Sequence, residues 1–146
     1  MTRSSAISGV GTIVQKWDIG TSDWTTIAEI TNISGPGMTR DLIEVTSLDS
    51  IDGYREFISG FRDGGNVVLS MNYTRAGLDE FLADFESTVI QNYEIYLPDG
   101  TSIEFEGYVQ EFPLTIPTDS QITMETTIKI SGPPTINSGL NSSAPA

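Results

Sequence analysis

Apolar and polar residues alternate over several short segments of the chain, as expected for strands that bury one face of a sheet. The pattern is clearest in residues 66–73 (NVVLSMNY), where Val67, Leu69, Met71 and Tyr73 fall on one face. Other segments with strand composition or alternation are residues 25–33, 93–97, 102–111 and 121–131. Together they predict a mainly antiparallel β fold.

An Asp-Gly pair at residues 99–100 separates the segments 93–97 and 102–111, and it predicts a hairpin between them. Pro113 and Pro117 interrupt the link to the last strand, because proline cannot donate a ladder hydrogen bond. The side chains predicted to face the core in these later strands are Ile103, Phe105, Val109, Ile122, Met124, Ile128 and Ile130.

Residues 77–87 (GLDEFLADFES) change to a helical period. Leu78, Phe81, Leu82 and Phe85 fall at i, i+3, i+4 and i+7, which predicts one amphipathic helix. We expect this stripe to cover the sheet core. The acidic residues predicted on the opposite face are Asp79, Glu80, Asp84 and Glu86.

A long segment, residues 34–65, lies between two predicted strands and reads SGPGMTRDLIEVTSLDSIDGYREFISGFRDGG. Loops longer than about 12–15 residues are uncommon in compact domains and are usually functional or disordered. This segment is too apolar for disorder, and it holds three of the seven basic residues. We therefore predict an assembly loop that contacts another copy of the chain. Its candidate contact residues are Arg40, Asp41, Ile43, Tyr54, Arg55, Phe57, Phe61 and Arg62.

The predicted fold is an antiparallel β-sandwich or barrel with one α-helix (about 77–87), the long inter-strand loop (34–65) and extended terminal arms. At 146 residues the chain is expected to form a single domain, 1–146. The N-terminal arm is residues 1–12. The C-terminal arm is residues 132–146, whose Pro-, Ser- and Asn-rich sequence can bury little surface.

Composition excludes several kinds of chemistry. The chain has no cysteine and no histidine, so it lacks the thiolate nucleophile, the commonest general base and the commonest transition-metal ligand. No run of about 18 apolar residues is present, and we expect a soluble protein with no membrane partner. Seven basic and twenty acidic residues give a net charge of −13, which disfavours binding to nucleic acid. No cofactor, metal or catalytic site is predicted.

Two other classes of function remain open at this point. An enzyme would depend on paired carboxylates such as Asp49 with Asp52, or Glu104 with Glu106, but nothing else completes such a site. A β-sandwich binding module, for example for carbohydrate, would use Trp17 and Trp24, which lie near predicted turns. The glycines of residues 35–37 and 64–65 lack the Lys-Ser/Thr of a phosphate loop, so they are interpreted as turns.

Four pieces follow one another between Thr25 and about Thr135. They are IAEITNISGPGMTRDLIEVTSLDS, then GYREFISGFRDGG with NVVLSMNY, then the helix with NYEIYLPDGTSIEFEGYVQEF, and last TTIKISGPPT. No single piece is catalytic or rigid in spacing, but in this order they resemble the major tail tube proteins of long-tailed bacteriophages with non-contractile tails. The tube protein of a phage-derived injection device is a related alternative.

The resemblance implies a structural virion protein, made in the host cytoplasm, whose copies form stacked six-membered rings. The long loop would reach a neighbouring subunit or ring, and duplex DNA would pass through the lumen without specific binding. Further implied partners are the tape-measure, tail tip and terminator proteins. Six copies would carry six times −13, or −78 charges. An acidic lining would repel DNA.

The candidate lining residues are Glu104, Glu106 and Glu125. Each of them could equally lie on the outside of the tube. Lys129, on the same predicted strand face as Glu125, would interrupt a continuous acidic wall.

Overall fold

The computed structural model describes residues 9, 11–18, 20–27, 30–49 and 51–138. The predicted N-terminal arm (1–12) lies almost wholly outside the described residues, as do residues 139–146 of the predicted C-terminal arm. The elements in chain order are β1 (Ile13–Asp18), β2 (Asp23–Ile27), β3 (Ile30–Ser34), β4 (Thr39–Glu44), a 3₁₀ turn (Ile51–Gly53), β5 (Phe57–Asp63), β6 (Asn66–Asn72), α1 (Arg75–Glu86), β7 (Gln91–Tyr96), β8 (Thr101–Glu111), β9 (Leu114–Thr115), β10 (Thr123–Ile130) and β11 (Thr135–Ser138).

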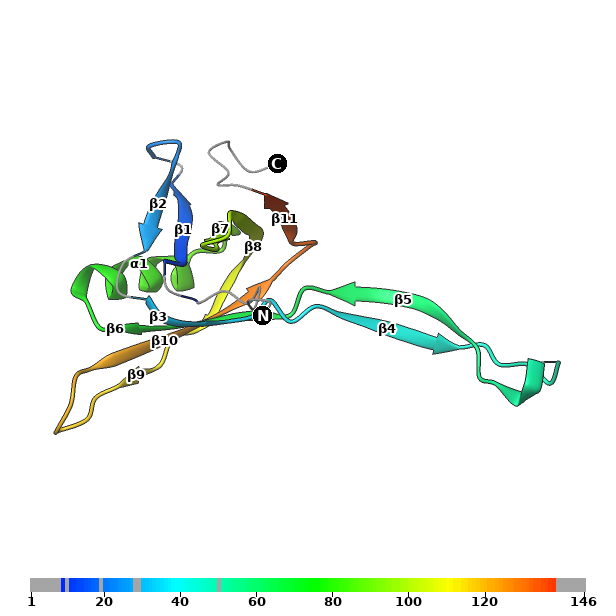
Figure 1. Ribbon diagram of the computed structural model, residues 1–146. Helices are drawn as coiled ribbons and strands as arrows, with labels where there is room; N and C mark the ends of the chain where they lie inside the picture. Colours follow the sequence, from blue (N-terminus) through cyan, green and yellow to red (C-terminus); the bar gives the residue numbers. More distant parts are fainter. Residues whose placement is uncertain (1–8, 10, 19, 28–29, 50, 139–146) are drawn as a thin grey trace, which may run out of the picture.

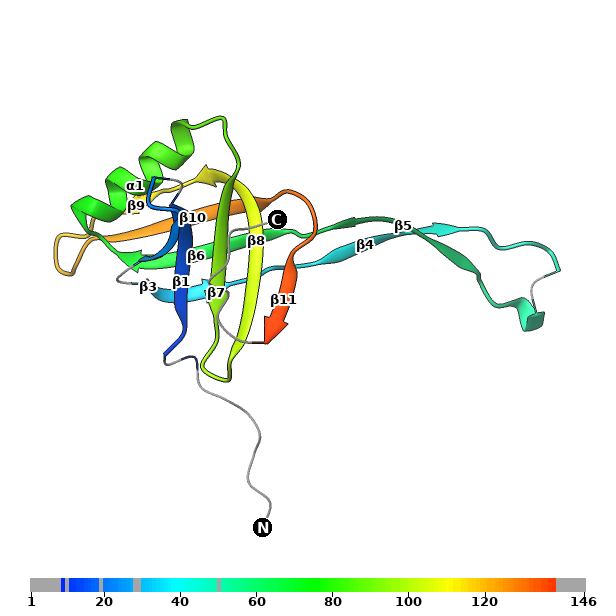
Figure 2. The ribbon, with the colours of Figure 1, turned by 90° about the horizontal axis from the view of Figure 1, so that it is seen from above.

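One antiparallel sheet of nine strands forms the body. Seven follow the order β2-β1-β7-β8-β10-β6-β3, and the other two pair beside this path, β11 with β8 and β9 with β10. Figure 2 shows that β1 and β7 run across the direction of β10, β6 and β3, so the sheet folds into two layers. Among the described residues the end strands β2 and β3 do not pair, and the sheet does not close into a barrel. The predicted mainly β, antiparallel fold with one helix is confirmed.

Strand β8 joins the two layers because its two halves pair with different strands along the same edge. Residues 107–111 pair with β10, and residues 101–104 pair with β11. Gly107 permits this change, since a Cβ atom there would collide with the carbonyl oxygen of Lys129. Residues 135–138 of the predicted C-terminal arm form β11: the edge of β8 that β10 leaves open offers unpaired backbone groups, and β11 pairs with them.

The core lies between the two layers and under α1. Of the predicted core residues, those that are buried are Val67, Leu69, Met71, Phe105, Val109, Met124, Ile128 and Ile130. Two strands of the sequence prediction need correction. Residues 25–33 form parts of two strands rather than one, because β2 pairs with β1 whereas β3 pairs with β6. Strand β1 was not predicted.

Helix α1 begins two residues earlier than predicted, because the Thr74 hydroxyl accepts the Gly77 N–H at 3.0 Å and caps the helix. Its buried side chains are Phe81 and Asp84, whereas Leu82 and Phe85 are exposed. The predicted orientation, with Asp84 on the outer face, is therefore wrong. The helix is turned so that a carboxylate enters the protein.

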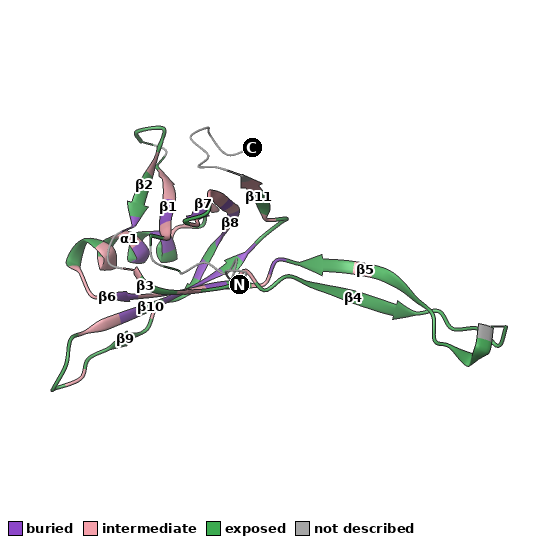
Figure 3. Cartoon of the chain, in the orientation of Figure 1, coloured by how far each residue is buried: buried purple, intermediate pink, exposed green. Residues whose placement is uncertain are grey.

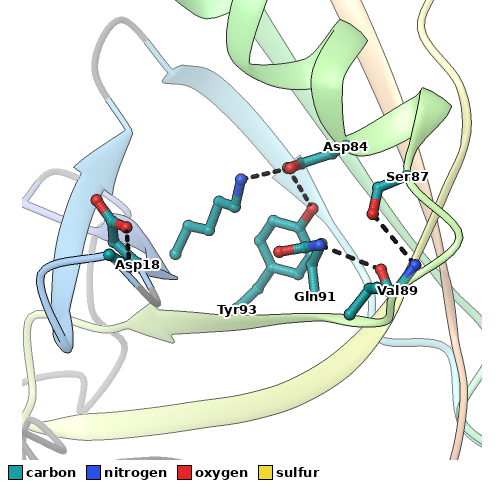
Figure 4. Close-up of polar contacts among 8 residues, drawn as sticks. Asp18, Asp84, Ser87, Val89, Gln91 and Tyr93 are labelled. Carbon is teal, nitrogen blue, oxygen red and sulfur yellow. Dashed lines mark hydrogen bonds and ion pairs between the residues drawn. The ribbon is translucent and has the colours of Figure 1, made fainter.

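Asp84 is buried because two distant residues bind it (Figure 4). The Tyr93 hydroxyl donates to its Oδ2 at 2.9 Å, and the Lys16 ammonium forms an ion pair with its Oδ1. Burial, together with the neighbouring Asp84 carboxylate, raises the pKa of Tyr93, which stays protonated and able to donate. This cluster fixes α1 to β1 and β7.

Asp84→Ala is expected to lower the free energy of unfolding by about 3 kcal/mol, because the Lys16 ammonium and Tyr93 hydroxyl lose their acceptor. Urea denaturation measures the change. Asp79→Ala is the matched control, since Asp79 lies on the same helix but its ion pair with Arg75 is exposed. We expect the control to lose less than about 1 kcal/mol. Equal losses in the two variants would contradict the proposed anchoring role.

Candidate assembly interface

Strands β4 and β5 form a separate two-stranded sheet that projects from the body (Figures 1 and 2). We call residues 38–63 the arm. The segment predicted as a long loop (34–65) is thus largely a β-hairpin. The sequence did not reveal its strands because a register shift between Arg40 and Leu42 breaks the alternation, and because apolar residues point to both faces.

The two faces of the arm both carry apolar side chains. Ile43 lies directly opposite Ile58 on one face. The adjacent Leu42 and Phe57 point to the other face, since successive side chains of a strand alternate. A two-stranded hairpin is at best marginally stable in water by itself. The arm therefore has the surface of an element that is covered on both sides by a partner.

Exposure of the arm is nearly complete (Figure 3). Every arm residue whose burial is described is exposed except Gly60. Phe61 is 89% exposed and Tyr54 is 74% exposed. All eight predicted assembly residues lie on this one element, and their contacts with a partner stay a prediction. They are Arg40, Asp41 and Ile43 on β4, Tyr54 and Arg55 near the tip, and Phe57, Phe61 and Arg62 on β5.

The arm begins where two glycine-containing segments cross closely. Gly35 and Gly65 have positive φ angles of 100° and 75°. A Cβ atom on Gly65 would collide with the carbonyl oxygen of Gly37, and one on Gly35 would collide with that of Asn66. Only glycine combines this backbone conformation with such an approach. The interpretation of these glycines as turns rather than a phosphate loop agrees with their positions beside β3 and β6.

An ion pair joins the base of the arm to the body. The Lys129 ammonium of β10 lies 2.8 Å from Asp63 Oδ1, and the Gly65 N–H donates to the same oxygen at 2.8 Å. The hydrogen bond from Lys129 has the larger effect and that from Gly65 the smaller, and together they hold the pKa of Asp63 below its ordinary value of 3.8. Asp63 was not among the residues predicted from the sequence. The Asp-Gly-Gly sequence, typical of a turn closed by an Asp side chain, was the available signal.

The three arginines of the arm have no carboxylate partner within the described part of the chain. The ion pairs found there are Lys16–Asp84, Arg75–Asp79 and Lys129–Asp63. Arg40 lies directly opposite Arg62 on the neighbouring strand, a placement of like charges that is unfavourable in isolation. An acidic partner surface would relieve this repulsion and would also bind Arg55.

The candidate lumen residues lie on the sheet face that points away from the core. Glu104 and Glu106 are half-buried neighbours on β8, and Glu125 is exposed on β10. The structure brings the first two together but leaves Glu125 on the other layer. Lys129 is also exposed on β10, yet its charge is balanced by Asp63. The interruption expected from Lys129 is therefore weaker than the sequence alone implied.

The two tryptophans behind the alternative of a binding module are not placed as that alternative expected. Trp17 and Trp24 lie opposite each other on β1 and β2, with ring centroids 5.4 Å apart, rather than on loops. Each ring thus covers the other. Among the described residues no cluster of three or more acidic side chains is arranged to hold a metal ion. No helix in the described ranges is long and apolar enough to cross a membrane.

Residues 8–137 match the family model described as Lambda phage tail tube protein, TTP. The fold is similar to a chain from the tail of an empty gene transfer agent particle with C6 symmetry (20% identity, TM-score 0.74, covering 91% of this chain and 100% of that chain). It is also similar to the SPP1 tail tube (10% identity, TM-score 0.70, covering 93% of this chain and 81% of that chain). A third similar structure is a chain of the sheath–tube complex of the extracellular contractile injection system PVC (14% identity, TM-score 0.70, covering 92% of this chain and 93% of that chain). No curated protein matches the chain.

Proposed function

Because the chain belongs to the Lambda phage tail tube protein family, we propose that its copies form hexameric rings stacked into a tail tube that conducts genomic DNA. The family is one of structural virion proteins. The observation that carries the details of the proposal is the arm, which exposes apolar side chains on both faces and three arginines without a partner in the described chain. Six-fold symmetry is supported by the C6 symmetry of the gene transfer agent tail.

Assembly would also protect the edges of the sheet. Strands β2 and β3 are the two ends of the seven-strand path, so each has one edge without a strand partner among the described residues. Free edges promote uncontrolled pairing, and a ring of copies can cover each edge with a neighbour. A ring closed in this way leaves a wide central channel, since barrels of 16–18 strands are already open to water.

The lumen is proposed to be lined by Glu104, Glu106 and Glu125. Six copies carry six times −13, or −78 charges, and the one exposed lysine beside Glu125 is balanced by Asp63. Duplex DNA carries about one negative charge per 1.7 Å of axis, so an acidic wall would not hold it by counterion release. DNA would then pass through the tube without specific binding.

The tube is proposed to contact three further partners. A tape-measure protein would lie in the lumen, and a tip complex and a terminator would close the ends. The similar structures include a chain from a tube-terminating cap and one from a sheath/tube terminator, which supports the last of these partners. The similarity to the PVC sheath–tube complex favours a second candidate function, the inner tube of a contractile injection device. Purified virions with a sheath around the tube would favour the second candidate.

Negative-stain electron microscopy of the purified protein at rising concentration tests the proposal. We expect hollow, evenly stacked tubes above a threshold concentration. In the same samples, hydrogen exchange should show residues 34–65 exchanging fast in the monomer and slowly in the tube. A monomer at all concentrations, with residues 34–65 already protected, would exclude self-assembly through the arm and would favour a binding module.

A further inference from the structure

The exposed apolar side chains form two separate clusters. Sixteen large apolar residues are exposed among the described residues, of which nine lie on the arm. The other seven lie on the body: five of them form the second cluster, and Tyr108 and Ile136 belong to neither cluster. We call the five, together with the half-buried Phe112, the body patch: Leu82, Phe85, Val89, Phe112, Leu114 and Ile116.

Two rows of side chains make the body patch. Leu82, Phe85 and Val89 follow the outer side of α1 and the turn after it. Phe112, Leu114 and Ile116 lie before, in and after β9, at alternate positions of the sequence. The rings of Phe85 and Phe112 meet edge to face at 5.2 Å and join the two rows. The patch exists because α1 turns Asp84 inward and Phe85 outward.

Three carboxylates neighbour residues of the body patch in the sequence. Glu86 follows Phe85, Glu111 precedes Phe112, and Asp119 lies in the loop between β9 and β10. All three are exposed, and none forms an ion pair within the described chain. The patch therefore combines apolar side chains with free negative charge. The arm combines apolar side chains with free arginines, so the two surfaces are complementary.

We propose that the body patch is the receptor for the arm of a second copy, with the arm arginines facing Glu86, Glu111 and Asp119. The inference rests on the proposed tube and names the surface that each arm contacts. In both views the arm and α1 lie at opposite ends of the body (Figures 1 and 2). The contact is therefore head to tail, and each copy can donate one arm and accept another.

This geometry favours the body patch over a contact between two arms. A two-fold contact of arm with arm would bring Arg40, Arg55 and Arg62 of two copies together and would close at a dimer. A head-to-tail contact places those arginines against carboxylates and leaves one arm and one patch free for the next copies. Only such a heterologous contact generates rings or filaments by repetition.

Because the chain has no cysteine, single cysteines can locate the contact. Phe61→Cys or Tyr54→Cys in one preparation, isotope-labelled, is mixed with unlabelled Val89→Cys in the other. Tubes are then grown and treated with a short bismaleimide. We expect cross-linked peptides that join a labelled arm to an unlabelled body patch. Tyr108→Cys, exposed on the polar face of β8, is the matched control and should cross-link at least about tenfold less.

The outcomes separate this inference from the proposed function. Tubes whose arm cysteines cross-link to Tyr108→Cys or to another arm, and not to Val89→Cys, would overturn the receptor assignment and leave the tube intact. Absence of tubes in every preparation, the unmodified protein included, would overturn the tube itself and the receptor with it.

Exchange of charge gives an independent measurement. Glu86→Arg with Glu111→Arg should raise the concentration needed for assembly about tenfold or more. Adding Arg55→Glu and Arg62→Glu to the same chain should lower it again, because the attraction is restored with its sign reversed. A four-site variant that assembles no better than either two-site variant would contradict the pairing.

Discussion

Arg55→Glu is expected to give a folded monomer that no longer forms long tubes. Arg55 lies near the exposed tip of the arm and makes no ion pair within the described chain, so its replacement breaks no ion pair of the monomer. In the assembly it would turn attraction to an acidic partner into repulsion. If each subunit contact loses about 2 kcal/mol of binding free energy, its affinity falls roughly thirtyfold. Electron microscopy measures the tubes, and thermal unfolding measures the fold.

Arg75→Glu is the control for Arg55→Glu. It makes the same change of net charge, from −13 to −15, at an exposed position on the body. Arg75 is the first residue of α1, where glutamate is favourable to the helix dipole, so the fold should persist. Tubes should form normally. If Arg55→Glu assembles at the same concentration as the unmodified protein, the arm arginine does not lie at a subunit contact.

Glu104→Lys with Glu106→Lys is expected to permit tube assembly but to obstruct DNA passage. The net charge of six copies would change by +24 (six times four), all of it along the lumen. Lysines that neutralise phosphates release counterions, so DNA would bind the wall with an affinity that falls steeply as salt rises. Infectivity of virions built from the variant should drop by orders of magnitude. Isolated tubes should retain short duplex DNA at low salt and release it at high salt.

A graded series distinguishes charge from damage to β8. Glu104→Gln with Glu106→Gln removes the negative charges without adding positive ones, and it should have a much smaller effect on infectivity than the lysine pair. Tubes must form in both variants for the comparison to hold. Normal infectivity and no DNA retention in the lysine variant would place Glu104 and Glu106 on the outside of the tube.

Strands that bury one face were the elements best predicted from the sequence. The predicted segment 66–73 corresponds to β6, 93–97 to β7, 102–111 to β8 and 121–131 to β10, each within two residues at either end. Alternation is a local signal, and the burial of Phe105, Val109, Met124 and Ile128 follows from it directly. The exposed segment proposed for assembly was also recognised locally, because apolar residues and arginines coincide in a stretch with no room in the core.

Pairing between distant segments could not be read from any local pattern. Strand β11 forms because β10 leaves the edge of β8 open, and β2 separates from β3 because their partners differ. The orientation of α1 depends on Lys16 and Tyr93, which lie 68 and 9 residues from Asp84. A helical stripe records only which residues share a face, so the buried carboxylate was assigned to the wrong side.

By itself the sequence determined the β-rich class of the fold, the helix, the acidic charge, the absence of histidine and cysteine chemistry, and the segment that is proposed to contact a partner. Each of these depends on composition or on neighbours within a few residues. Only the tertiary structure decided that this segment is a projecting hairpin fastened by Lys129 and Asp63, and that α1 turns Phe85 outward to complete an apolar patch. Those features arise where distant segments compete for the same hydrogen bonds and the same buried space, and that competition is resolved only when the whole chain is folded.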